Sequence, residues 1–182
     1  NFGTGANIDQ QFKRLGEVRP NAPKMCSEFW SGWFDKWGAR HETRPAKAMV
    51  EGIDEMLSKG ISFSLYMTHG GTSFGHWAGA NSPGFQPDVT SYDYDAPINE
   101  WGLATPKYYE LQKMMAKYTS GKKLPAVPKA PMPIISVPEF KLTEYKPLSN
   151  GISDEKESNK PLSFEDMDMG WGTMVYTTTL PE

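Results

Sequence analysis

A carboxylate followed by aromatic residues is the feature of this sequence best suited to chemistry. Glu28 comes directly after a short apolar run, and aromatic side chains follow at Phe29, Trp30 and Trp33. Aromatic faces pack against the C–H faces of a pyranose, and a carboxylate meets the positive charge that develops at the anomeric carbon. The segment therefore favours a sugar-cleaving site. The alternative interpretation is a surface glutamate beside aromatic residues of the core.

A second polar segment alternates tyrosine and aspartate ahead of a proline. Tyr92, Asp93, Tyr94 and Asp95 follow one another within residues 90–97. Phenol and carboxylate groups hydrogen-bond to sugar hydroxyls, so the segment is a candidate for contacts with a carbohydrate. The alternative is a surface turn that Asp95 stabilises.

A glycine-rich loop at residues 69–77 carries two histidines, His69 and His76. Its glycines lack the spacing of phosphate-binding loops, so we interpret the loop as backbone that approaches a substrate closely. No third ligand is spaced to join the two histidines in a metal site. We expect neither a metal nor another cofactor.

Cys26 is the only cysteine, which excludes an internal disulfide. On a regular strand its side chain would point to the same side as that of Glu28, because strand side chains alternate. No histidine stands at a spacing typical of a cysteine nucleophile, so we expect a small buried residue.

Periodic apolar residues predict the elements that position these side chains. Helices are expected at about residues 8–18, 45–59 and 106–118, and strands at 24–29 and 61–67. Short connections between alternating helices and strands are typical of βα units on a parallel sheet. The candidate residues follow the strands, and in a βα barrel that end is the active-site face.

The composition changes after Gly121, where five prolines fall within residues 125–138. We expect a proline-rich, polar linker at 121–160, after a barrel portion at 1–120. Residues 174–180 have strand character, so 161–182 is interpreted as the beginning of an all-β domain of sandwich or jelly-roll type.

Several motifs occur together, in this order and with these gaps: Ser27-Glu28-Phe29, Gly32-Trp33, Leu65-Tyr66-Met67, Gly70-Gly71-Thr72, Ala80-Asn81-Ser82-Pro83 and residues 90–97. The ordered set resembles glycoside hydrolase family 35, the exo-acting β-galactosidases, strongly over about residues 1–120. The resemblance implies the last part of a (β/α)8 TIM barrel, an α/β fold. It also implies removal of terminal non-reducing β-D-galactose through a covalent galactosyl-enzyme, with retention of configuration.

The resemblance also implies roles for five residues. Glu28 matches the family's catalytic nucleophile, at the end of the seventh barrel strand. Tyr66, at the end of the eighth strand, matches a tyrosine that orients the nucleophile. Tyr94 matches a galactose-contacting tyrosine with Tyr92 beside it, and Trp30 is expected to shape the sugar pocket.

The family's acid/base glutamate lies at the end of the fourth strand, upstream of the segment that this chain resembles. Neither Asp93 nor Asp95 occupies its position, so neither is assigned as proton donor. The chain alone is expected to be inactive, and its expected partners are a β-galactoside and the remainder of the same barrel. With two strands of an eight-stranded barrel, we also expect it to be unstable in isolation.

The composition of the sequence limits the classes of partner and the functions that this chain could have. A net charge of -3 argues against nucleic acid or an anionic membrane as main partners, and no run of 18 apolar residues exists to span a bilayer. The alternatives are a carbohydrate-binding module without catalysis and a retaining β-glycosidase of other specificity. The single cysteine and the lack of an N-glycosylation sequon favour an exported bacterial protein, periplasmic or extracellular, with lysosome or vacuole as the alternative.

Overall fold

The computed structural model describes residues 1–128, 135–152 and 155–180, and the chain divides into two compact units, Asn1–Pro133 and Ile134–Glu182. Within the described residues, every α-helix and strand belongs to the first unit. The described part of the second unit contains two short 3-10 turns, Leu148–Gly151 and Glu165–Met167.

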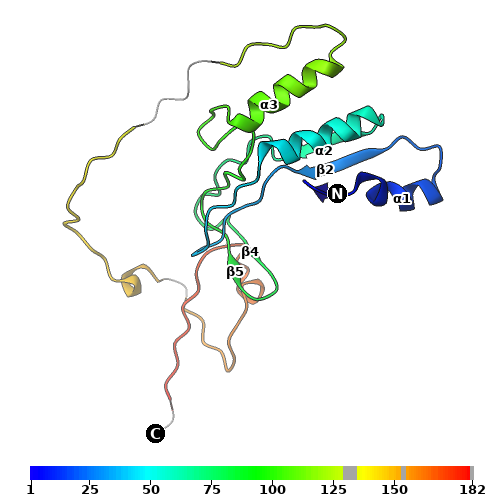
Figure 1. Ribbon diagram of the computed structural model, residues 1–182. Coiled ribbons are helices and arrows are strands. Elements are labelled where there is room, and N and C mark those ends of the chain that lie inside the picture. The colour runs from blue at the N-terminus through cyan, green and yellow to red at the C-terminus, as the bar shows by residue number, and fades with distance from the viewer. Residues whose placement is uncertain (129–134, 153–154, 181–182) are drawn as a thin grey trace. The chain divides into compact units, whose positions relative to one another are not determined.

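The first unit is built on a three-stranded parallel sheet with the order β1-β2-β3. Its strands are β1 (Phe2–Gly3), β2 (Met25–Trp30) and β3 (Ser62–Tyr66). The connections contain α1 (Ile8–Val18) and α2 (Ala46–Ser58), and α3 (Pro106–Met115) follows later in the chain (Figure 1). The predicted βα arrangement on a parallel sheet is therefore confirmed.

Local chemistry explains where the helices begin. The Asn7 side chain is the N-cap of α1 and accepts a hydrogen bond from the Gln10 amide at 2.9 Å. Pro45 is the cap of α2 rather than its first helical residue, so that helix begins one position later than predicted. Thr105 precedes α3, but its hydroxyl donates to the Pro97 carbonyl at 2.9 Å instead of capping the helix.

The helices cover one face of the sheet, and the hydrophobic core lies between the two layers. Figure 1 shows α2 and α3 side by side, and the two helices pack against each other. Ser62 and Ser64 of β3 are exposed, whereas Phe63 and Leu65 pack against the core. The core consists of ten buried residues: Phe2, Ile8, Phe12, Cys26, Phe29, Met49, Ile53, Met56, Ile61 and Met114.

A β-bulge in β2 changes which side chains share a face. Cys26 pairs with Phe63 and Phe29 with Leu65, so three steps along β2 match two along β3. The extra residue lets both Cys26 and Phe29 enter the core at 1% exposure. Cys26 is buried as predicted, but the prediction that it shares the side of Glu28 is wrong, because it assumed regular alternation.

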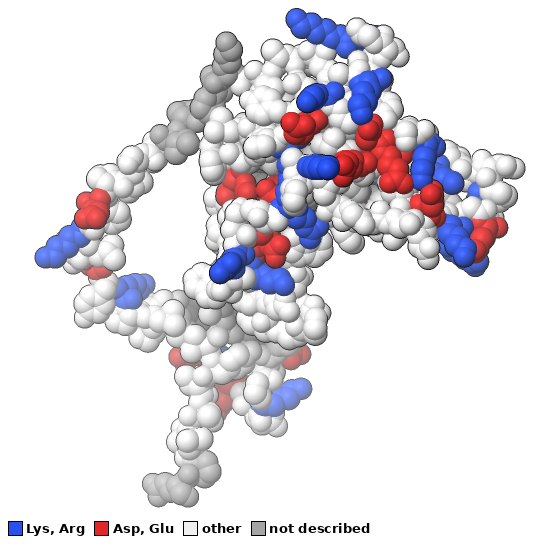
Figure 2. Space-filling view, viewed as in Figure 1, with Lys and Arg blue, Asp and Glu red and all other residues white. Residues whose placement is uncertain are grey.

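Ion pairs connect the exposed surfaces of neighbouring helices. Lys59, the C-cap of α2, donates to Asp9 of α1 at 2.7 Å, and Lys117 after α3 donates to Asp54 of α2 at 2.7 Å. Figure 2 shows acidic and basic side chains interspersed over this part of the molecule. Because these pairs are exposed, solvent screening keeps each of them weak.

The strand expected at 174–180 is not formed. These residues carry no strand pairing, although the Tyr176 hydroxyl donates to the Leu162 carbonyl. A strand needs a neighbour to satisfy its backbone groups, and the described residues of the second unit supply none. Of the prolines that define the expected linker, Pro131 and Pro133 lie outside the described residues.

Candidate active site

Glu28 lies near the carboxyl end of β2, in the bulge, and its side chain is half-buried. The carboxylate is close enough to the Tyr94 hydroxyl to contribute to a rise in the pKa of that phenol, after burial and Tyr66. None of the hydrogen bonds among the described residues engages the Glu28 carboxylate. The group is therefore placed to meet a ligand beside a tyrosine.

Tyr66 ends β3, directly across from Trp30 in the sheet register. Its hydroxyl lies 3.1 Å from that of Tyr92, and its ring meets the ring of Tyr94 edge-on with centroids 5.5 Å apart. The end of the strand and the segment at 92–94 thus come together, although 26 residues separate Tyr66 from Tyr92.

Tyr92 and Tyr94 stack on each other with ring centroids 5.5 Å apart. Tyr94 is only 2% exposed. Burial raises the pKa of both phenols above its ordinary value of 10.0, and for Tyr92 the hydrogen bond with Tyr66 adds to the rise. Both side chains therefore stay neutral and keep a hydroxyl proton to donate.

Three aromatic side chains, Trp30, Trp33 and Phe34, form an aromatic wall at the end of β2. Trp30 meets Trp33 edge-on at 5.6 Å, and Trp33 stacks on Phe34 at 4.9 Å. Phe34 in turn stacks on Tyr92 at 5.9 Å. The Arg44 guanidinium lies 5.7 Å above the Trp33 ring, a cation–π distance. Four of the predicted site residues, Trp30, Tyr66, Tyr92 and Tyr94, therefore lie in one connected group around the ends of β2 and β3. The fifth, Glu28, lies within electrostatic range of Tyr94.

Two glycines allow the 92–95 segment to approach these strand ends. A Cβ atom at Gly32 would lie 1.8 Å from the Tyr94 carbonyl oxygen, and one at Gly70 would lie 1.7 Å from that of Tyr92. Both distances are far inside van der Waals contact. Gly32 and Gly70 are thus required for the close approach. At Gly70 of the glycine-rich loop the neighbour is the chain's own Tyr92 carbonyl, and the expected approach of this loop to a substrate stays a prediction.

The sequence interpretation missed Lys107, which is 3% exposed. Its ammonium donates to the Ser31 carbonyl at 2.9 Å and to the Asp95 carbonyl at 2.7 Å, and it also binds the Asp95 carboxylate. Burial lowers its pKa, and Asp95 opposes that shift. One signal was visible in the sequence: a cation in the first turn of a helix opposes the helix dipole and needs an anion nearby.

His41 joins two further loops of the site. Its Nδ1 lies 2.7 Å from the Asp35 carboxylate, and its Nε2 lies 3.8 Å from that of Asp93. The hydrogen bond with Asp35, and then the charges of Asp35 and Asp93, raise the pKa of His41 above its ordinary value of 6.5 against the opposing effect of burial. The imidazole therefore connects the loop after β2 to the tyrosine segment.

Glu100 anchors the other side of the same segment. Its carboxylate accepts a hydrogen bond from the Ser91 hydroxyl at 2.6 Å and another from the Thr72 hydroxyl. Its backbone amide donates to Asp93 at 3.1 Å. The glycine-rich loop and the tyrosine segment are thereby held together through side-chain oxygens.

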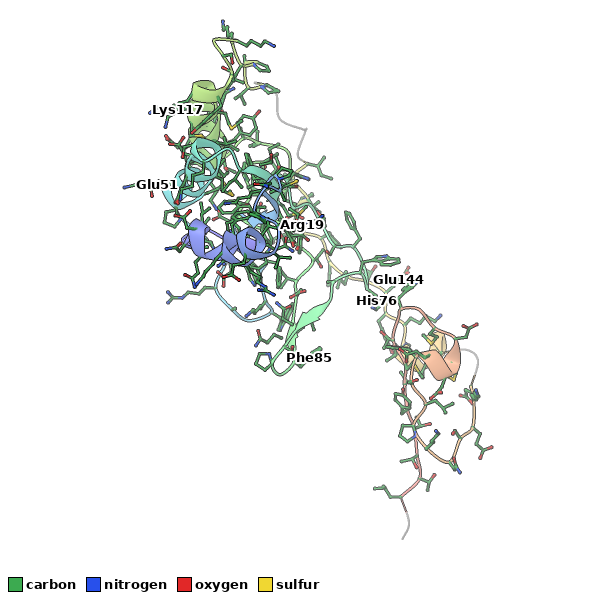
Figure 3. All side chains as sticks on the ribbon, turned by 90° about the vertical axis from the view of Figure 1, so that its right-hand side faces the viewer. Arg19, Glu51, His76, Phe85, Lys117 and Glu144 are labelled. Atoms are coloured by element: carbon green, nitrogen blue, oxygen red, sulfur yellow. The ribbon has the colours of Figure 1, made fainter. Side chains whose placement is uncertain are left out.

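A short antiparallel hairpin, β4 (Ala80–Asn81) and β5 (Gln86–Pro87), lies beyond the glycine-rich loop. Phe85 lies in its turn and is 83% exposed (Figure 3). The described residues contain no group of three His, Cys, Asp or Glu side chains able to hold a metal ion. Nor does any helix in the described ranges have the length and apolar character to cross a membrane.

The chain is similar to several curated proteins along its whole length. It is 38% identical over 191 residues to a beta-galactosidase of Homo sapiens and 37% identical over 191 residues to one of Bos taurus, with 100% of the chain covered. It is 36% identical over 193 residues to a beta-galactosidase-1-like protein of Mus musculus, with 98% covered. The chain spans only 27% to 28% of the length of these relatives.

A family model adds an independent line of evidence. The model of glycosyl hydrolases family 35 matches residues 1–118, which include β1 to β3, α1 to α3 and every residue of the site. Since the match covers well over half of the chain, this chain belongs to glycosyl hydrolases family 35.

Proposed function

We propose that this chain is the part of a retaining exo-β-galactosidase that carries the catalytic nucleophile. Family membership implies a TIM-barrel catalytic domain, in which the carboxyl ends of the strands carry the active site. The observation that carries the proposal is Glu28, a half-buried carboxylate near such a strand end with Tyr94 in its electrostatic range.

In this mechanism the Glu28 carboxylate attacks the anomeric carbon of a terminal β-galactosyl group while the glycosidic C–O bond breaks, and the departing oxygen takes a proton from the acid/base residue. Water then hydrolyses the covalent galactosyl-enzyme, which releases galactose and frees Glu28. The hydroxyls of Tyr66, Tyr92 and Tyr94 donate hydrogen bonds to the nucleophile or to sugar oxygens. The wall at Trp30 packs against the apolar face of the sugar. These roles are supported by the contacts among Tyr66, Tyr92 and Tyr94 and by the position of Trp30 across from Tyr66 in the sheet.

Retention of configuration needs a second carboxyl group about 5–5.5 Å from the nucleophile. Asp93 and Asp95 are engaged elsewhere: Asp93 accepts a hydrogen bond from the Glu100 amide, and Asp95 binds Lys107 and the Arg44 amide. We therefore place the acid/base residue in another part of the same barrel. This proposal agrees with the fraction of its relatives that the chain spans.

The test is Glu28→Gln in the complete protein that carries this chain. The substitution keeps the size of the side chain and removes its nucleophilic charge. We expect kcat on a nitrophenyl β-galactoside to fall by roughly a thousandfold or more, with little change in galactose affinity. Turnover that survives the substitution would refute the role of Glu28.

The same assay separates the two other candidate functions. A carbohydrate-binding module, which the aromatic wall would suit, binds galactose but gives no turnover in the unmodified protein. A retaining β-glycosidase of other specificity cleaves the nitrophenyl β-glucoside at least as well as the galactoside, since the two sugars differ only at the 4-hydroxyl.

For the compartment, the comparisons give the expected bacterial source no support, because the relatives named above are mammalian. We propose the lysosomal or vacuolar alternative. Fluorescence microscopy of the complete tagged protein tests this proposal, and a periplasmic or purely extracellular location would contradict it.

A further inference from the structure

Lys107 occupies an unusual environment for a lysine. It lies in the first turn of α3, where the helix dipole disfavours a cation, and its side chain is 4% exposed. Buried ammonium groups persist when acceptors replace the lost water. Here three oxygens do so, the carbonyls of Ser31 and Asp95 and the Asp95 carboxylate.

The first of these acceptors belongs to the junction between the two strands that carry Glu28 and Tyr66. Ser31 follows β2 directly and is fully buried. Its amide donates to the Tyr66 carbonyl at 3.1 Å, and its hydroxyl donates to the Met67 carbonyl at 2.9 Å. A hydrogen bond to the Ser31 carbonyl therefore fixes Lys107 relative to both strand ends.

The other two acceptors belong to the turn that presents Tyr94. Tyr94 and Asp95 have backbone φ angles of 62° and 50°, two consecutive left-handed residues that are not glycine. Such a conformation persists where surrounding contacts hold it in place. Lys107 binds Asp95 through both its backbone and its side chain, and the Arg44 amide donates to the same carboxylate oxygen at 2.6 Å.

We propose that Lys107 is a positioning residue, which holds the Tyr94 hydroxyl in place relative to Glu28 and Tyr66 at the sugar site. The inference rests on the proposed function, because it assigns Lys107 an effect on galactoside turnover through Tyr94. The ammonium is a single connection among the end of β2, the end of β3 through Ser31, and the left-handed turn. A lysine that only stabilised the fold would act independently of the Tyr94 hydroxyl.

A double-mutant cycle in the complete protein separates these two roles. The variants are Lys107→Met, Tyr94→Phe and their combination, assayed for kcat/KM on a nitrophenyl β-galactoside. We expect Lys107→Met to lower kcat/KM by about tenfold or more when Tyr94 is present, and by less than about threefold in the Tyr94→Phe background. Lys113→Met, an exposed lysine on the same helix, is the matched control and changes neither background.

Equal losses in both backgrounds, or no loss at all, would overturn the positioning role while the unmodified enzyme remains active. If the unmodified protein hydrolyses no β-galactoside, the proposed function fails first and this inference fails with it. If Lys107→Met lacks a cooperative thermal transition, the same cycle with Asp95→Asn decides. That variant keeps the shape of the side chain and removes the charge that binds the ammonium. We expect Asp95→Asn to lower kcat/KM by about tenfold or more when Tyr94 is present, and by less than about threefold in the Tyr94→Phe background.

Discussion

Tyr94 is held in a backbone conformation that tyrosine rarely adopts. Each left-handed residue that is not glycine costs about 1–2 kcal/mol, and Tyr94 is followed by a second one at Asp95. Strain of this kind gathers at functional sites, where the surrounding contacts support it. In this protein the supporting contacts come from Lys107, Arg44 and the close passage of the turn over Gly32.

Gly32→Ala is predicted to disrupt the site by displacing the turn that carries Tyr94. The new methyl group would lie 1.8 Å from the Tyr94 carbonyl oxygen, so the turn has to move away. Because small displacements of binding groups are costly, we expect kcat/KM on a β-galactoside to fall about 100-fold.

Gly79→Ala is the matched control for this prediction. Gly79 is another loop glycine, but its added Cβ would come no closer than 3.8 Å to a neighbour, an ordinary contact. Steady-state kinetics on the complete protein gives both values. A Gly32→Ala enzyme as active as Gly79→Ala would show that the close approach is not required.

The raised pKa of His41 predicts that the stability of the folded protein depends on pH. Its pKa in the folded protein is raised above 6.5, so the contribution of its contacts is fully present below pH 6.5. The contribution is then lost as pH rises through the raised value. Since the side chain is 53% exposed, solvent screening keeps the effect below about 1 kcal/mol.

Thermal melting of the complete protein and of His41→Gln measures this contribution. We expect the wild-type advantage in Tm at about pH 5 to shrink by about pH 8. An advantage that is constant over this range, or that grows with pH, would contradict the assignment.

Among the elements, the contact of α2 with the sheet depends on a missing side chain. A Cβ at Gly52 would lie 2.9 Å from the ring of Phe29, which is in the core. The helix therefore approaches β2 more closely than alanine would permit. Phe29 itself enters the core because of the bulge, so the same irregularity affects both the core and the setting of Glu28.

Alanine substitutions at two glycines within helices are predicted to change the free energy of unfolding in opposite directions. Gly16→Ala in α1 has open space around the new methyl group and should raise the free energy of unfolding by up to about 1 kcal/mol, through helix propensity. Gly52→Ala should lower it by about 1–3 kcal/mol through overpacking. Chemical denaturation of the complete protein measures both, and two changes of the same sign would mean that α2 has room to move.

The helices and the two longer strands could be predicted because their apolar residues repeat with the period of each element. The convergence of Tyr66, Tyr92 and Tyr94 followed from the rule that functional side chains gather at the carboxyl ends of parallel strands. The bulge at Glu28 could not be predicted, since it depends on how the core accepts Cys26 and Phe29. Lys107 was missed although a cation in the first turn of a helix needs an anion nearby, because nothing in the sequence brings the Ser31 carbonyl, 76 residues away, to its ammonium.

At the level of the whole molecule, the sheet has two edge strands with which no further strand pairs within the described residues. β1 and β3 each pair on one side only. Open edges and unpaired apolar surface favour association with other chains or with the remainder of a barrel. The terminal strand expected at 174–180 likewise finds no partner among the described residues of the second unit.

We therefore predict that the 182-residue chain, produced alone, does not fold cooperatively. Circular dichroism melting should give a broad transition or none, and gel filtration should give aggregates. Co-production with the remaining part of the protein should restore a soluble species. A compact monomer with a sharp melting transition would contradict this prediction.

Mass spectrometry of a trapped intermediate tests whether Glu28 forms a covalent bond to galactose. The complete protein is incubated with a 2-deoxy-2-fluoro-galactosyl donor, which forms the covalent intermediate but releases it slowly. We predict a mass increase of one fluorogalactosyl group on the peptide that contains Glu28. An adduct on another residue, or none on a folded and active enzyme, would contradict this prediction.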